Sequence, residues 1–142
     1  MQTVDQMMKA KGPGVYSIGP EAPVLDALRL LSEKHIGALL VMRGPELVGI
    51  LSERDYARKV VLLGRSSADT PVEQIMSSQV TTVDRSATVT ECLELMTERR
   101  IRHLPVVEGG RVFGMLSIGD CVKAVIEDQR HHIEDLERFI RS

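Results

Sequence analysis

An internal repeat constrains this chain more than any other feature of its sequence. Residues 20–60 align without a gap to the residues 65 positions later, and 14 of the 41 pairs are identical. Val24 matches Val89, and Asp55 matches Asp120. Before Val15 the offset becomes 68, so the first copy carries three extra residues in a Gly/Pro-rich loop. Self-similarity of this kind predicts two copies of one small folding unit.

Each copy shows the same succession of patterns. A short β-rich segment, 15–18, precedes apolar residues at helical spacing from Val24 to Leu31. Two apolar strands, 38–42 and 47–51, follow around a Gly-containing turn, and Ser52 then begins a second helix. The second copy repeats this order, starting from residues 80–83. The predicted fold class is therefore α+β (α/β), with two β-α-β-β-α repeats.

A unit of about 50 residues cannot bury both of its faces alone, so the two copies should pack around a pseudo-twofold axis. We expect repeat 1 with its leader over 1–66, a linker over 67–71, repeat 2 over 72–127 and a C-terminal helical extension over 128–142. In this extension and the helix before it, residues recur at coiled-coil spacing: Val122, Ile126, Gln129, Ile133, Leu136 and Ile140. Such a stripe could pack on its own module, on a dimer partner or on a client protein.

Composition excludes several functional classes. The net charge is −2 and aromatic residues make up 3% of the chain, which argues against nucleic-acid binding by a basic patch or by base stacking. Two cysteines are too few for a disulfide framework or a cysteine zinc cluster. No apolar run approaches a membrane span of about 20 residues, and the N-terminus lacks a signal peptide's apolar core. A cytoplasmic protein without membrane contact is expected.

The motifs Ser52-Glu53-Arg54-Asp55 and Ser117-Ile118-Gly119-Asp120 carry the sharpest chemical signal. A carboxylate at a helix start can accept hydrogen bonds from the two hydroxyls of a ribose, and the free backbone N–H groups there favour phosphate. The same spacing is also typical of a capping box. That motif prefers Glu or Gln where both repeats have Asp, so residue types alone leave both interpretations open.

Three segments carry a family resemblance: VEQIM (72–76), IGALLVMRGPELVGILSERD (36–55) and RIRHLPVVEGGRVFGMLSIGD (100–120). With them the chain resembles a tandem pair of cystathionine-β-synthase (CBS) domains, a Bateman module, over roughly Val4 to Glu127. The resemblance implies a sensor that binds AMP, ADP, ATP, NAD(H) or S-adenosylmethionine in clefts between the repeats. It also implies pairing of modules into disc-shaped dimers.

The resemblance assigns roles to individual residues. Asp55 and Asp120 would bind ribose, while Arg102 and His103 would face the cleft and contact phosphate. Without the family, Arg102 would be interpreted as a solvated charge and His103 as a polar strand-edge residue. The nucleotide-binding set it implies is Tyr16, Gly37, Ala38, Ser52, Arg54, Asp55, Thr81, Ile101, Arg102, His103, Ser117 and Asp120.

The two clefts should differ chemically. Gly37 and Ala38 stand where the second copy has Arg102 and His103, and Gly119 replaces Arg54. Tyr16 and its counterpart Thr81 would lie against adenine, although Tyr16 could equally cover the core. One hypothesis is that the clefts take different ligands, AMP in one and a longer dinucleotide in the other.

The expected function is a stand-alone, non-catalytic regulatory module that signals energy or redox state to an unknown client protein. AMP is the first candidate ligand, with ADP, ATP or NAD(H) also possible and no metal required. The module should form a homodimer. Alternatives are a structural, partner-binding dimer without ligand, and an S-adenosylmethionine sensor. No nucleophile–base–acid set, Walker loop or GxGxxG motif supports an enzyme.

Overall fold

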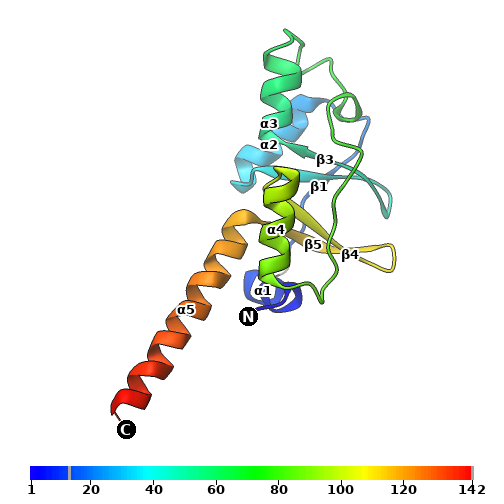
Figure 1. Ribbon diagram of the computed structural model, residues 1–142. Helices are drawn as coiled ribbons and strands as arrows, with labels where there is room; N and C mark the ends of the chain where they lie inside the picture. Colours follow the sequence, from blue (N-terminus) through cyan, green and yellow to red (C-terminus); the bar gives the residue numbers. More distant parts are fainter. Residues whose placement is uncertain (13, 142) are drawn as a thin grey trace. The chain divides into compact units, whose positions relative to one another are not determined.

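The computed structural model describes residues 1–12 and 14–141, which form two compact units (Figure 1). Unit 1 comprises Met1–Gly14, Thr82–Gly109 and Phe113–Ser142, and unit 2 comprises Val15–Thr81 and Gly110–Val112. The leader of the chain thus packs with the second repeat, and residues 72–81 pack with the first. The mixed helix and strand content expected from the repeat is confirmed.

Unit 2 is built around a three-stranded sheet in the order β1-β2-β3. Strand β1 (Ser17–Ile18) lies parallel to β2 (Ala38–Arg43), which pairs antiparallel with β3 (Glu46–Ser52). Its helical elements are α2 (Val24–Lys34), α3 (Glu53–Tyr56), the π-helical turn η1 (Ala57–Val61) and the 3₁₀ turn η2 (Val72–Gln74). All residues of the predicted first site, from Tyr16 to Asp55, lie in this unit.

Unit 1 has a two-stranded sheet of β4 (His103–Glu108) and β5 (Arg111–Ser117). Its helices are α1 (Val4–Lys11), α4 (Val89–Arg99) and the 24-residue α5 (Ile118–Arg141), which extends away from the other elements of the unit (Figure 1). Among the described residues, no helix combines the length and apolarity needed to cross a membrane.

The two equivalent helices end in the same way. His35 after α2 and Arg100 after α4 both adopt the left-handed conformation, with φ of 54° and 55°. In each case the backbone N–H returns to carbonyls of the last helical turn. A left-handed residue stops a helix by satisfying those carbonyls, so both strands that follow start at the same point of their repeat.

The first strand is where the repeats differ. In unit 2 the Leu40 N–H donates to the Tyr16 carbonyl at 3.3 Å. The position equivalent to Leu40 is Pro105, which has no N–H. The expected strand over 80–83 is accordingly reduced to an isolated parallel bridge between Val83 and Val106.

Each unit has its own apolar core, and both are built as composition predicts, from aliphatic side chains, methionine and cysteine. The core of unit 2 consists of Val24, Ala27, Leu31, Leu39, Val41, Leu51, Val60, Val72 and Ile75. The core of unit 1 consists of Val4, Met7, Val89, Cys92, Met96, Leu104, Val106, Leu116, Cys121 and Ala124. Val4 and Val72, equivalent at the 68-residue offset, are both fully buried, so each unit is completed by a segment from outside its repeat.

Candidate functional site

The start of α3 holds Asp55 in a capping box. The Ser52 backbone N–H and hydroxyl both donate to Asp55 Oδ2, at 2.9 and 3.0 Å, and the Asp55 N–H donates to Ser52 Oγ at 3.3 Å. Lys59, one turn further along, places its Nζ 3.7 Å from Oδ1. The carboxylate is therefore fixed at the helix start by groups from its own segment.

The start of α5 repeats this cap with one addition. The Ser117 N–H donates to Asp120 Oδ2 at 2.8 Å, and the Asp120 N–H donates to Ser117 Oγ at 3.2 Å. Lys11, the last residue of α1, donates from Nζ to the same Oδ2 at 2.9 Å and to the Met115 carbonyl at 2.9 Å. A cation from the chain's leader thus joins the second cap.

A backbone hydrogen bond connects each cap to the residue just before a strand, β2 in unit 2 and β4 in unit 1. The Glu53 N–H donates to the Gly37 carbonyl at 3.1 Å, and the Ile118 N–H donates to the Arg102 carbonyl at 2.8 Å. Within unit 2 this brings Gly37 and Ala38 next to Ser52 and Asp55. The Ala38 side chain is fully buried, so only its backbone can contribute to a site.

In unit 1 the same hydrogen bond places the exposed Arg102 and the half-buried His103 beside Ser117 and Asp120. The half-buried Ile101 precedes them, and its N–H donates to the Met96 carbonyl at the end of α4. The structure therefore groups the predicted residues from 101 to 103 with Ser117 and Asp120, and we call these residues the second group. The first group consists of Gly37, Ala38, Ser52 and Asp55. In each group the backbone hydrogen bond between the helix start and the residue before the strand brings the residues together.

Electrostatics differ between the two caps. Burial would raise the pKa of the Asp120 carboxyl, but hydrogen bonds from Lys11 and Ser117 outweigh it, and the pKa lies below its usual value. Burial, followed by the charges of Lys11 and Arg102, lowers the pKa of His103. The second group therefore combines an ionised carboxylate, a neutral imidazole and two cations. Such a set can accept hydroxyl hydrogen bonds and attract an anion.

Three further predicted residues lie outside these hydrogen-bonded groups. Tyr16 precedes β1, is 39% exposed and has Lys34 Nζ 5.3 Å from its ring centroid. Thr81 is half-buried at the end of a segment of unit 2, and Arg54 is exposed on α3. Lys34 therefore makes a cation–π contact with the Tyr16 ring, and Tyr16 is still accessible to a ligand.

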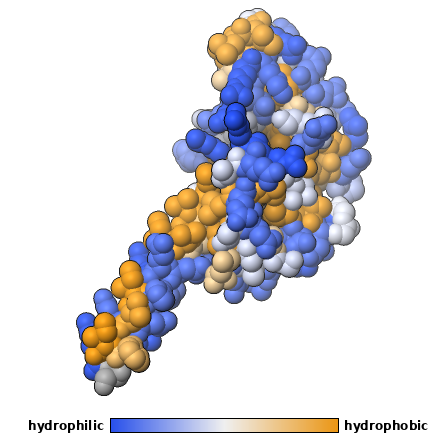
Figure 2. Space-filling view, in the orientation of Figure 1, coloured by the Kyte–Doolittle hydropathy of each residue, from blue (hydrophilic) through white to orange (hydrophobic). Residues whose placement is uncertain are grey.

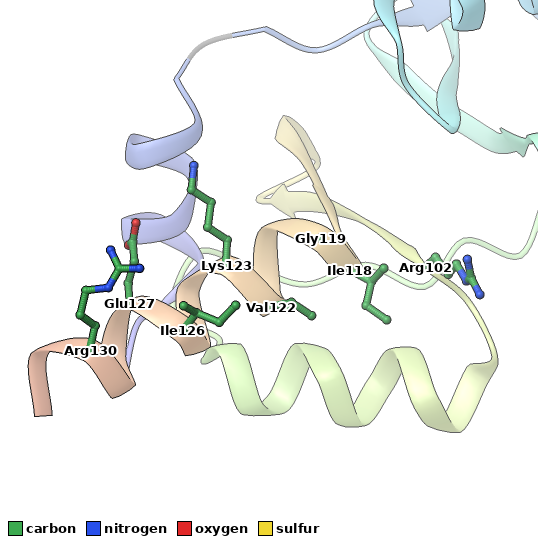
Figure 3. A pocket seen from close by; sticks show the side chains of 8 residues that line it. All are labelled: Arg102, Ile118, Gly119, Val122, Lys123, Ile126, Glu127 and Arg130. Carbon is green, nitrogen blue, oxygen red and sulfur yellow. The ribbon is translucent and has the colours of Figure 1, made fainter. Parts of the chain in front are cut away.

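Two hollows in unit 1 adjoin the second group. One, of about 300 Å³, lies beside Lys11 and includes Arg85, whose guanidinium stacks 4.1 Å from the Phe113 ring centroid. The other, of about 600 Å³, follows α5 and includes Arg102, Ile118 and Gly119 (Figure 3). Arg102 thus lines a groove on one side and adjoins the Asp120 cap on the other.

Lys11 is the residue that sequence reasoning missed. It lies 109 positions from Asp120, and the repeat gives no hint of it, because the position 68 residues later is Gln79. Its contact depends on the packing of α1 with the second repeat. A signal existed only in the equivalence of Val4 and Met8 with Val72 and Met76, which marks the leader as part of the repeat unit.

Two repeats with matching caps, matching strand starts and exchanged leader segments define a tandem CBS pair, a regulatory module. The CBS domain family matches residues 6–62 and 72–127. These matches cover most of the chain, which therefore belongs to the CBS-domain family.

Relatives cover nearly the whole chain. The mitochondrial CBS domain-containing protein CBSX3 of Arabidopsis thaliana is 36% identical over 148 aligned residues, spanning 98% of this chain and 72% of the relative. A solved CBS-domain protein of Burkholderia ambifaria MC40-6 is 52% identical with a TM-score of 0.87, covering 90% of this chain and 96% of that one. A Pyrobaculum aerophilum CBS-domain protein solved in complex with AMP is 25% identical with a TM-score of 0.75, covering 84% and 89%.

Proposed function

We propose that this chain is a non-catalytic module that binds an adenine nucleotide, AMP first among them, and passes its occupancy to a client protein. The observation that carries the proposal is the second cap, where an oriented carboxylate at a helix start lies among Lys11, Arg102 and His103. Nucleotide binding by a similar CBS-domain protein complexed with AMP supports it. ADP, ATP and NAD(H) offer the same ribose and phosphate chemistry.

In the second group, different residues would bind the ribose, the phosphate and the base of the nucleotide. Asp120 Oδ2 accepts two hydrogen bonds, from Lys11 Nζ and from the Ser117 N–H, which would leave Oδ1 to accept hydrogen bonds from the ribose hydroxyls. Ser117 would contribute its hydroxyl. Arg102 and Lys11 would attract the phosphate, and His103 would donate or accept a single hydrogen bond. Ile101 would supply an apolar contact to the base.

The first group would take its cations, Arg54 and Lys59, from the helical segment that carries Asp55. Asp55 and Ser52 take the ribose roles, Arg54 the phosphate role and Tyr16 the adenine role. Gly37 and Ala38 offer backbone groups and room instead of charge. We therefore keep the proposal that the two groups prefer different adenosine ligands, AMP in one and a longer dinucleotide such as NADH in the other.

Signalling would follow from a population shift, in which the nucleotide binds one arrangement of the module better than another. In a homodimer, the two arrangements would be two relative placements of the copies. A cytoplasmic location also stays a prediction.

The test is titration of AMP by calorimetry into the wild-type chain, Asp55→Ala, Asp120→Ala and the double variant. Loss of a charged hydrogen-bond set should weaken binding at the altered site by about 1–3 kcal/mol. Asp26→Ala is the matched control, because Asp26 is an exposed carboxylate in the first turn of α2 and pairs only loosely with Arg29, at 4.0 Å. Circular dichroism verifies that each variant is folded.

Unchanged affinity in both single variants and the double variant would refute the ribose assignment. Absence of AMP binding by the wild type, with heat released by S-adenosylmethionine or by no adenosine ligand, would replace the proposal by one of the two alternatives. Competition between AMP and NADH decides whether the groups differ. One shared stoichiometric site for both ligands would refute the proposal of different preferences.

A further inference from the structure

The outer part of α5 is exposed to solvent. Every described residue from 129 to 141 is exposed, and Ile133 and Ile140 are 55% and 79% exposed. A helical segment of this length is marginal in water unless an apolar face is buried. Figure 2 shows apolar side chains continuing along this helix to its far end. A partner that buries this face would stabilise the helix.

The exposed apolar residues of α5 form a seam with coiled-coil periodicity. Counting from Val122, successive seam residues are 4, 3, 4, 3 and 4 positions apart. This makes Ile126, Ile133 and Ile140 the a positions, and Val122, Gln129 and Leu136 the d positions. β-branched residues at a with Leu at d favour parallel two-stranded coiled coils, and one polar core residue fixes the register. Isoleucine occupies every a position, and Gln129 is the single polar member.

We propose that this seam pairs in parallel with the same seam of a second copy, so that the two C-terminal helices form a short coiled coil. The inference deepens the proposed function, since it rests on the proposed homodimer and names the surface and orientation that join it. A parallel pair is a symmetric interface in which each residue meets its own counterpart. Two copies joined in this way would have their second repeats side by side.

The polar residue of the seam favours the parallel orientation, in which Gln129 meets Gln129 of the second copy. In the parallel pair, His132 at a g position faces Glu137 at the following e position of the second copy, and the contact occurs twice. In the antiparallel pair that overlaps the whole seam, Val122 faces Ile140 and Gln129 faces Ile133. At the e positions Arg130 then faces Arg130 of the second copy, and Lys123 faces Glu137 twice. The attraction between Lys123 and Glu137 offsets the repulsion at Arg130. The orientation is decided by Gln129, whose amide lies against an apolar side chain in the antiparallel pair and meets a second amide in the parallel pair.

The inner end of the seam continues into the groove of about 600 Å³ described above (Figure 3). Ile118, Val122 and Ile126 contribute its apolar wall, and each is at least 39% exposed. The seam therefore does not stop where α5 leaves the rest of unit 1. A second helix would find apolar surface along the full length of α5.

The decisive experiment introduces one cysteine by Ile140→Cys and oxidises the protein under mild conditions. A parallel pair brings residue 140 next to its counterpart, so a covalent dimer should form on a non-reducing gel. The full-overlap antiparallel pair would separate the two cysteines by most of the helix length. The matched control is Glu134→Cys, which is exposed on the same helix but outside the seam. The native Cys92 and Cys121 are buried. Wild-type protein oxidised under the same conditions shows how much crosslinking these two cysteines cause.

A second measurement uses native mass spectrometry across a concentration series. Ile133→Asp would bury a charge in the seam and should weaken dimerisation at least about tenfold. His131→Ala, outside the seam, should leave it unchanged. Folding of both variants is expected to be retained, because these side chains are exposed.

The outcomes separate the inference from the proposal on which it rests. A monomeric wild type would refute both the proposed dimer and the coiled coil. A stable dimer that neither crosslinks through residue 140 nor responds to Ile133→Asp would refute the coiled coil alone. Loss of AMP binding with the crosslink intact would refute only the nucleotide proposal.

Discussion

The two caps have the same local geometry but different sources of positive charge. Asp55 meets Lys59, four residues away on the same helical segment, at 3.7 Å. Asp120 meets Lys11, from the other end of the chain, at 2.9 Å, and has Arg102 and His103 on the adjoining strand start. Charge at the first cap is therefore a local property. At the second cap it depends on the docking of α1, so packing can change its chemistry.

The segments that the two units receive from outside their repeats are held in different ways. In unit 2, Ile50 and Ser77 exchange two backbone hydrogen bonds, at 3.0 and 2.9 Å. Both units also hold the received segment through an equivalent antiparallel bridge at its start, and in unit 1 Lys11 adds a side-chain contact. The additional strand-like contact of unit 2 brings residues 76–77 against β3. The first repeat should therefore tolerate less change at its contact.

The largest expected effect comes from Gly49→Ala, which tests that tight contact. A Cβ at Gly49 would meet the Met76 side chain and lie 3.0 Å from the Ser77 carbonyl. The methionine can move, but the carbonyl belongs to the hydrogen-bonded segment, so overpacking should cost about 1–3 kcal/mol. Urea unfolding followed by circular dichroism measures this loss.

Gly19→Ala is the matched control, because nothing lies within 4 Å of its Cβ position and its φ is not in the left-handed region. Its stability should remain close to that of the wild type. Equal stabilities for Gly49→Ala and Gly19→Ala would contradict the tight contact between β3 and residues 76–77.

The next effect in size compares the caps directly through Ser52→Ala and Ser117→Ala. Loss of a serine N-cap typically costs about 1 kcal/mol. Both serine hydroxyls hydrogen-bond the aspartate of their own cap, and Ser52 should cost more because the cation beside Asp55, Lys59 Nζ, lies 3.7 Å away. Lys11 supports the second carboxylate independently of the serine hydroxyl. Thermal unfolding of both variants tests the order, and a larger loss for Ser117→Ala would reverse the comparison.

The fold was largely predictable because its signals are local and occur twice. Helical spacing from Val24, the glycine turn at Gly44 and the cap at Ser52 each reappear 65 residues later, and the structure contains these elements in both repeats. The short strand over 80–83 was overestimated. Its apolar pattern was visible, but its parallel partner has Pro105 in place of a hydrogen-bond donor.

The candidate site was predictable to a different degree. The spacing from Ser117 to Asp120 indicated either a cap or a ligand group, and the structure contains the cap, while ligand binding stays a prediction. Lys11 could not be derived, because a contact between α1 and the second repeat leaves no periodic pattern in sequence. Charge brought in by tertiary packing is the part of a site that local patterns do not encode.

The smallest expected effect on stability comes from Lys11→Met, which removes the cation that distinguishes the second cap. Burial alone favours the protonated carboxyl, so the pKa of Asp120 should rise, as measured by the NMR titration of its carboxyl carbon. A folded-state pKa below the unfolded value stabilises the fold above the ordinary pKa, and this stability is lost as pH falls through the folded value. Lys11 and Asp120 are partly exposed, at 40% and 24%, so the loss at neutral pH should stay below about 1 kcal/mol.

Lys9→Met provides the control, because Lys9 lies on the same helix but pairs with Asp5 at 2.9 Å. It should leave the Asp120 titration unchanged. The stability difference between wild type and Lys11→Met should shrink in acid, once Asp120 is protonated in both proteins. An Asp120 titration that is the same with and without Lys11 would mean that the charge of the second cap, like that of the first, is set within its own repeat.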